Sequence, residues 1–222
     1  MSAYIPSNPH STKVVERIGH IGAIVIIRHL NPDLTLSVVD AIVEGGIDIL
    51  EITLDSLAAL ETIASLRKRT GEHTLVGAGT VCCQEDAIRA IDAGAQFVVA
   101  PNTNADVISW CNQVDIPAIP GALTPTEITN AVDLGADLVK IFPARAVGPQ
   151  YIADVLAPLN GLKLVPTGGI SLDNAGDYIK SGGFAIGIGS SLVGSAIVEE
   201  RNWAGVTQAT RQLANIIAST KI

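Results

Sequence analysis

Lys140 is the residue of this 222-residue sequence whose surroundings most clearly indicate chemistry. It lies in the apolar segment Leu138–Phe142 (LVKIF), and it is the one lysine of six that lies inside such a segment near its C-terminal end. Side chains alternate between the two faces of a β-strand, so Lys140 would share an inward face with Leu138 and Phe142. Burial disfavours the charged ammonium and lowers the pKa of a lysine. An unprotonated amine can attack a carbonyl carbon and form a Schiff base.

Glu51 has a similar setting. It lies near the end of the apolar run Ile47–Thr53 (IDILEIT), where it shares a strand face with Thr53. Charged residues are seldom buried unless they are paired. A carboxylate beside a nucleophilic amine can move protons as a general acid and base. The alternative is a structural ion pair between Glu51 and Lys140, and the two interpretations overlap because a catalytic pair would also be close.

Two glycine-rich segments late in the chain follow apolar runs and suggest a phosphate site. They are Thr167–Gly169 (TGG) and Gly187–Ser191 (GIGSS). Glycine lets the backbone approach an anion closely, and backbone N–H groups can then bind phosphate. Tight turns between strands and helices are the alternative explanation. A third segment, Gly77–Thr80 (GAGT), completes neither common nucleotide-binding motif, so we expect its small residues to leave space for a ligand.

Short apolar runs recur along the chain and predict buried strands, because each is too short for a helix and most are rich in valine and isoleucine. The eight runs are Ala23–Arg28, Ile47–Thr53, Thr74–Thr80, Gln96–Pro101, Ile116–Pro120, Leu138–Phe142, Lys163–Pro166 and Ala185–Gly189. The stretches between them carry apolar residues at helical spacing. This alternation predicts an α/β fold, a TIM (β/α)8 barrel with an extra N-terminal helix around Ser11–Gly19. An open doubly wound sheet is the rival fold.

We expect one domain over residues 1–222, because no linker or low-complexity segment interrupts the pattern. Residues 1–10 (MSAYIPSNPH) are expected to form a flexible N-terminal segment and lack the basic and apolar regions of a signal peptide. A barrel adds a positional rule, since catalytic groups lie at the C-terminal ends of its strands. The polar residues expected at such ends are Arg28, Glu51, Thr53, Thr80 and Lys140.

Composition argues against several classes of function. There are 14 Lys and Arg against 22 Asp and Glu, a formal net charge of −8, whereas nucleic-acid binding needs clustered basic charge. The mean hydropathy is +0.40, but the longest apolar run is Ile21–Ile27, and a membrane helix needs about 20 residues. The hydropathy therefore predicts a well-buried interior, a subunit interface or both. The three cysteines and four histidines lack metal-ligand spacing, so we expect no metal and a cytoplasmic protein with reduced thiols.

Several motifs together resemble one family, the class I 2-keto-3-deoxy-6-phosphogluconate (KDPG) aldolases with the related phosphogalactonate and 4-hydroxy-2-oxoglutarate aldolases. The resemblance covers nearly the whole chain, from Ile21 to Val193. The motifs are EIT at Glu51–Thr53, GAGTV at Gly77–Val81, PN at Pro101–Asn102, IPG at Ile119–Gly121, TPTE at Thr124–Glu127, KIFPA and GPQYI between Lys140 and Ile152, PTGGI at Pro166–Ile170 and GIGSSLV at Gly187–Val193.

The resemblance implies a TIM-barrel lyase, usually a homotrimer, that needs no metal or other cofactor. By their match to the family motifs, Lys140 corresponds to the Schiff-base lysine and Glu51 to the general acid and base. The implied substrate-binding residues are Arg28 and Thr80 at the pyruvate end, Phe142 as an aromatic wall beside the lysine, Gly168, Gly169, Gly189 and Ser190 at the phosphate end, and in addition Pro101 and Thr167.

The implied substrate is a small molecule, a 2-keto-3-deoxy sugar acid phosphate that yields pyruvate. The first expectation is reversible cleavage of KDPG to pyruvate and D-glyceraldehyde 3-phosphate. The galactonate epimer and 4-hydroxy-2-oxoglutarate remain alternatives. A phosphate-binding decarboxylase or isomerase barrel is a rival enzyme, and a barrel that binds a sugar-acid phosphate without catalysis is a rival from another class.

Position 55 departs from one branch of the family, whose members carry arginine two residues after the threonine of the EIT-type motif. Here the residue is Asp55, and Arg28 is the one arginine that matches. A carboxylate at the mouth of the barrel would repel an anionic substrate unless it is paired or turned outward. Arg145, which follows the Lys140 strand, is a candidate partner or a compensating anion binder. The alternative is a solvated surface arginine.

Overall fold

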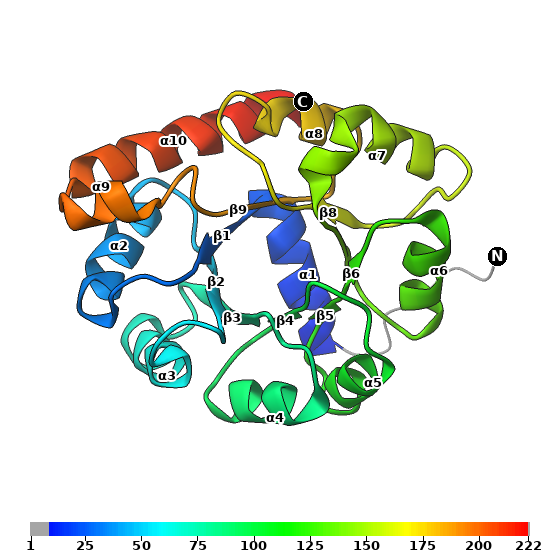
Figure 1. Ribbon diagram of the computed structural model, residues 1–222, viewed down its shortest axis with the longest axis horizontal. Helices are drawn as coiled ribbons and strands as arrows, with labels where there is room; N and C mark the ends of the chain where they lie inside the picture. The colour runs from blue at the N-terminus through cyan, green and yellow to red at the C-terminus, as the bar shows by residue number, and fades with distance from the viewer. Residues whose placement is uncertain (1–8, 222) are drawn as a thin grey trace.

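The computed structural model describes residues 9–221 and alternates strands with helices along its length (Figure 1). The strands are β1 (Ala23–Ile27), β2 (Ile49–Thr53), β3 (Leu75–Gly79), β4 (Val98–Val99), β5 (Ala118–Ile119), β6 (Gly121–Ala122), β7 (Val139–Ile141), β8 (Leu164–Pro166) and β9 (Ile186–Ile188). The helices are α1 (Pro9–Ile21), α2 (Pro32–Glu44), α3 (Ala59–Thr70), α4 (Gln84–Asp92), α5 (Ala105–Gln113), α6 (Pro125–Asp133), α7 (Gly148–Leu156), α8 (Ala175–Lys180), α9 (Ser195–Glu199) and α10 (Trp203–Thr220), with a 3₁₀ turn at Ala144–Ala146.

The strands form two sheets in which every described strand pair is parallel. One sheet has the order β5-β4-β3-β2-β1-β9, and the other has the order β6-β7-β8. Strands β5 and β6 are separated by Pro120 alone, so together they occupy one of the eight predicted strand positions. At the other edges, Thr167 after β8 forms a parallel bridge with Gly187 of β9, and the Phe184 N–H donates to the Leu164 carbonyl oxygen at 2.9 Å. The prediction of parallel strands alternating with helices is confirmed.

The helices surround the strands, and α1 lies across the middle of this arrangement (Figure 1). The extra N-terminal helix predicted around Ser11–Gly19 is therefore present, and it extends over Pro9–Ile21. Of the segment expected to be flexible, Pro9 and His10 instead begin this helix, and residues 1–8 lie outside the described part of the chain.

Helix α1 fills the inside of the strand layer at the N-terminal ends of the strands. Val14, Val15 and Ile18 belong to one apolar cluster with strand residues that include Ile24 and Ile49. A second, larger cluster lies between the strands and the surrounding helices. These two clusters bury the strands on both faces, and this burial accounts for much of the high mean hydropathy. Within residues 9–221, no helix combines the length and apolar character needed to cross a bilayer.

Candidate active site

Glu51 and Lys140 are buried charged residues within two different strands. Their exposed fractions are 3% and 6%. Glu51 lies opposite Ile26 and Gly77 in the sheet, and Lys140 lies opposite Gly121 and Val165. Burial raises the pKa of Glu51 above its ordinary value of 4.5, and the charge of Lys140 opposes this increase. The two residues predicted to carry the chemistry are thus electrostatic neighbours, although they are 89 positions apart in the sequence.

Phe142 and Gly168 form the immediate surroundings of the lysine. The Lys140 Nζ atom lies 4.8 Å from the centroid of the Phe142 ring, within the range of a cation–π contact. A Cβ atom on Gly168 would lie 3.2 Å from the same ring. The aromatic wall expected beside the lysine is therefore adjacent to the first glycine of the predicted phosphate segment.

Pro101 lies near the Lys140 strand because its carbonyl group packs against Gly121, and Gly121 is the residue opposite Lys140 in the sheet. A Cβ atom on Gly121 would lie 2.8 Å from the Asn102 nitrogen and closer still to the Pro101 carbonyl group. The Lys140 N–H also donates to the Pro120 carbonyl oxygen at 2.8 Å. Glycine at position 121 thus lets the turn after β4 approach the lysine strand.

Arg28 and Asp55 form an ion pair beyond the C-terminal ends of β1 and β2. His29 Nε2 lies 3.3 Å from the same Asp55 oxygen, Oδ2. The candidate partnership between Asp55 and Arg145 is therefore wrong, because Asp55 pairs with the residues that follow the neighbouring strand. Burial alone would raise the pKa of Asp55, but hydrogen bonds with Thr53 and Arg28 and the nearby positive charges outweigh burial and lower it.

Thr80 follows β3 directly and has a positive φ of 61°. It lines a cavity of about 330 Å³ beside the ends of β2 and β3. The other lining residues are Leu54, Asp55, Leu60, Cys82, Asp86 and Arg89. The cavity adjoins the Arg28–Asp55 pair, but neither Glu51 nor Lys140 lines it, so the ligand space expected from the small residues of Gly77–Thr80 stays a prediction.

The two glycine-rich segments predicted to bind phosphate lie next to each other. Thr167 pairs with Gly187, and a Cβ atom on Gly187 would lie 2.9 Å from Thr167 Cγ2. Gly168 and Gly169 have φ values of 92° and 83°, which favour glycine. Ser190 is exposed at the end of the second segment, after the half-buried Gly189.

Arg145 lies beside the first of these segments. The backbone N–H of Arg145 donates to the Gly168 carbonyl oxygen at 2.9 Å. A Cβ atom on Gly169 would lie 3.1 Å from Arg145 Cδ. The side chain is exposed. Because Asp55 pairs with Arg28, two interpretations of Arg145 remain from the sequence: an anion-binding residue and a solvated surface arginine.

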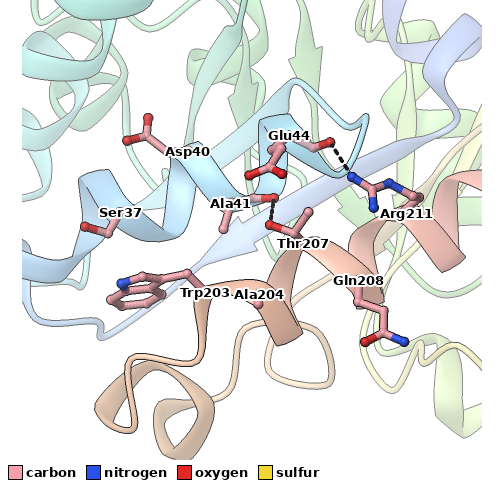
Figure 2. Close-up of a pocket in the computed structure, with 9 residues that line it drawn as sticks. All are labelled: Ser37, Asp40, Ala41, Glu44, Trp203, Ala204, Thr207, Gln208 and Arg211. Atoms are coloured by element: carbon pink, nitrogen blue, oxygen red, sulfur yellow. Dashed lines mark hydrogen bonds between the residues drawn. The ribbon is translucent and has the colours of Figure 1, made fainter.

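A different hollow of about 490 Å³ lies on the outside of the fold, between α2 and α10. Figure 2 shows Trp203, Ser37 and Asp40 around it, and Thr207 and Arg211 donating to the Ala41 and Glu44 carbonyl oxygens. The two hydrogen bonds measure 3.1 and 3.4 Å. None of the residues predicted to be functional lines this hollow, so the hollow between α2 and α10 is separate from the candidate active site.

A family model described as "KDPG and KHG aldolase" matches residues 14–209 of this chain. The chain belongs to this aldolase family. Its relatives are named aldolases, and aldolases are lyases because they break a carbon–carbon bond without hydrolysis or oxidation, so this chain is a lyase.

Two curated relatives differ in the substrate named. The 2-dehydro-3-deoxy-phosphogluconate aldolase of Haemophilus influenzae is 32% identical over 92% of this chain and 97% of its own. The 2-dehydro-3-deoxy-6-phosphogalactonate aldolase of Escherichia coli is 35% identical over 76% of this chain and 83% of its own. Membership of the family is therefore compatible with either sugar epimer as the substrate, the gluconate or the galactonate derivative.

A solved relative bears on the mechanism. The crystal structure of KDPG aldolase from Legionella pneumophila contains pyruvate captured at low pH as a covalent carbinolamine intermediate. That protein is 26% identical to this aldolase, with a TM-score of 0.82 over 88% of this chain and 97% of its own. The fold of this aldolase is therefore shared with a relative that forms a covalent adduct with pyruvate.

Proposed function

We propose that this chain is a class I aldolase that reversibly cleaves KDPG to pyruvate and D-glyceraldehyde 3-phosphate. The observation that carries the proposal is the burial of Lys140 and Glu51 as electrostatic neighbours. The phosphogalactonate epimer is the second candidate substrate, favoured by the relative from Escherichia coli. The dicarboxylate 4-hydroxy-2-oxoglutarate is the third, because the matching family model also names KHG.

The proposed reaction begins with attack of the unprotonated Lys140 Nζ on the C2 carbonyl carbon of the substrate. The resulting carbinolamine loses water and becomes an iminium ion. Glu51 exchanges protons with the oxygen that leaves, directly or through water. The positive iminium nitrogen then serves as the electron sink for the next step.

Glu51 next takes the proton of the C4 hydroxyl group. The C3–C4 bond breaks, C4 becomes an aldehyde carbon, and the bonding electrons pass to C3 and the iminium to give an enamine. Protonation at C3 restores the iminium, and water releases pyruvate and free Lys140. The raised pKa of Glu51 suits this role, because a carboxyl group must both accept and return the proton near working pH.

The other residues bind the two ends of the substrate in this proposal. Arg28 and Thr80 bind the carboxylate or carbonyl group of the pyruvate end, and Phe142 covers one side of the reacting carbons, with Pro101 nearby. The phosphate binds to Thr167, Gly168, Gly169, Gly189 and Ser190. The adjacency of the two glycine segments across the Thr167–Gly187 bridge supports a single phosphate site.

We also infer that the two sheets form one closed eight-stranded barrel within a single domain over residues 1–222, with β5 and β6 as one strand position. The contacts between β8 and β9 support closure. A cytoplasmic homotrimer that needs no cofactor is the accompanying proposal, and it rests on the family resemblance. Size-exclusion chromatography with light scattering measures the oligomeric state, and a monomeric or dimeric mass would contradict the trimer.

Borohydride trapping tests the Schiff base directly. Reduction in the presence of pyruvate should add a stable adduct that peptide mapping places at Lys140, and Lys140→Ala should show neither the adduct nor turnover. Lys163→Ala is the matched control, because Lys163 is also near a strand and a phenylalanine ring but precedes its strand. An unmodified wild-type protein would contradict the mechanism.

The substrate is tested by pyruvate release, coupled to lactate dehydrogenase, from KDPG, its galactonate epimer and 4-hydroxy-2-oxoglutarate. The proposal expects the highest kcat/KM for KDPG. A higher value for either other substrate would transfer the assignment to it. Binding of all three without release of pyruvate would instead support a non-catalytic barrel.

A further inference from the structure

Arg28 and Asp55 form an ion pair between two loops, outside every strand and helix of the described residues. Arg28 follows the last residue of β1, and Asp55 lies two residues after the end of β2. Their side chains are 51% and 30% exposed, so the pair faces the mouth of the fold. Exposed ion pairs contribute little to stability, which makes a purely structural role for this pair a small one.

A second set of contacts fixes the same two loops against each other. The His29 N–H donates to Ser56 Oγ at 2.9 Å, and Ser56 Oγ lies 2.9 Å from Thr53 Oγ1. Thr53 is only 1% exposed at the end of β2. His29 has a positive φ of 53°, which is uncommon for a residue other than glycine. The loop after β1 is therefore held to a buried anchor, and this restricts where Arg28 can place its guanidinium.

The charges of this pair reach Glu51. Burial raises the pKa of Glu51, the charges of Lys140 and Arg28 lower it, and the charge of Asp55 raises it. Arg28 and Asp55 thus act on Glu51 in opposite directions. His29 and the Cys82 thiol also interact electrostatically with Asp55, and the charged residues Asp86 and Arg89 line the cavity beside it. An unpaired Arg28 would leave net positive charge near the carboxyl group proposed to carry protons.

We propose that Asp55 is a positioning residue for the aldolase reaction, which holds the Arg28 guanidinium at the mouth and balances its charge beside Glu51. This inference rests on the proposed function, since it assigns Arg28 to the pyruvate end of the substrate. It also explains how a carboxylate is tolerated there. One Asp55 oxygen contacts both Arg28 and His29, so the carboxylate is already paired with a guanidinium before an anionic substrate arrives.

Asp55→Asn separates charge from contact, because asparagine keeps an oxygen that can accept from Arg28. The acid limb of the kcat/KM profile reports the essential base of the free enzyme. In Asp55→Asn this limb should move to lower pH, since Glu51 loses a nearby negative charge. In Arg28→Gln it should move to higher pH. The double variant, which lacks both charges, should have a limb close to that of wild type.

Asp55→Ala tests the positioning itself. Alanine offers Arg28 no acceptor, so the KM for pyruvate in the condensation direction should rise about two- to fivefold above that of Asp55→Asn. The value of kcat should change less than KM. A role confined to folding would alter neither the ratio of the two parameters nor the pH limb.

Asp48→Asn is the matched control. Asp48 precedes the same strand, β2, and pairs with Arg17 at 2.5 Å, with both side chains 28% exposed. Its variant should keep the wild-type acid limb. An unchanged limb in Asp55→Asn, or an equal shift in Asp48→Asn, would overturn the inference. Borohydride trapping of wild type distinguishes the two failures, because a trapped Lys140 with an unchanged Asp55→Asn limb leaves the proposed function standing.

Discussion

The Glu51 carboxyl group lies against the backbone of Gly79. A Cβ atom on Gly79 would lie 2.6 Å from Glu51 Cδ and 2.7 Å from its Cγ, far inside van der Waals contact. Strands β2 and β3 pair in parallel, and Gly79 lies opposite Thr53, two residues beyond Glu51. The absence of a side chain at position 79 therefore creates the space that the proposed general base occupies.

Gly79→Ala should move Glu51 from this place and reduce activity more than stability. The added methyl group meets a flexible side chain, which can rotate away, so the main effect is a misplaced carboxyl group. We expect kcat to fall about 10²-fold or more, within the contribution typical of a general acid or base. Steady-state kinetics and urea unfolding on the same preparations measure the two effects.

Gly77→Ala is the control for that prediction, since Gly77 lies two residues earlier on β3. A Cβ atom there would lie within 2.5 Å of three atoms of the Phe97 ring, which is completely buried. Overpacking of this kind costs about 1–3 kcal/mol of stability. If Gly79→Ala lost stability like Gly77→Ala and kept full activity, the proposed place of Glu51 in the reaction would be wrong.

Glu51→Gln should slow turnover severely and stabilise the fold at neutral and higher pH. Burial raises the pKa of Glu51 in the folded state above 4.5, so the folded protein holds a proton more tightly than the unfolded chain. That contribution to stability is fully present below pH 4.5 and is lost as pH rises through the folded-state pKa. Glutamine does not ionise and loses nothing over this range.

Urea unfolding of wild type and Glu51→Gln at a series of pH values measures this difference. The advantage of the variant should grow as pH rises and should be smallest below pH 4.5. The kcat of the variant should be about 10²–10⁴-fold lower than that of wild type. A stability difference that does not change with pH would mean that Glu51 titrates in the folded protein as it does in the unfolded chain.

Local sequence patterns predicted the architecture well, because parallel strands buried on both faces are continuous apolar runs. All eight runs contain strand residues, and Lys140 and Glu51 were found by the alternation within two of them. The pattern overlooked the break at Pro120, which divides the fifth run's strand position into β5 and β6. Proline has no backbone N–H to donate to a neighbouring strand, so Pro120 interrupts the hydrogen bonding while the strand position continues into Gly121–Ala122.

The contacts at the mouth could not be predicted in the same way. Arg28 and Asp55 lie 27 positions apart in exposed loops, where no periodicity indicates direction. The sequence raised the question of a partner for Asp55, and Arg145 was the wrong candidate. Parallel pairing of β1 with β2 decides the matter, since it brings the ends of these two strands side by side. The role of Gly79 was likewise visible only from the position of its neighbour's side chain.

Ser190→Asp should weaken binding of phosphorylated substrates selectively. Ser190 is exposed at the end of the segment after β9, beside the segment that contains Gly168 and Gly169. A carboxylate placed there would repel a phosphate that the two segments bind together. KM should rise far more for KDPG than for 4-hydroxy-2-oxoglutarate, which carries no phosphate, and kcat should change little for either. Ser65→Asp, with the same charge change on the exposed face of α3, should alter neither KM. Equal increases for both substrates would place the phosphate elsewhere in the active site.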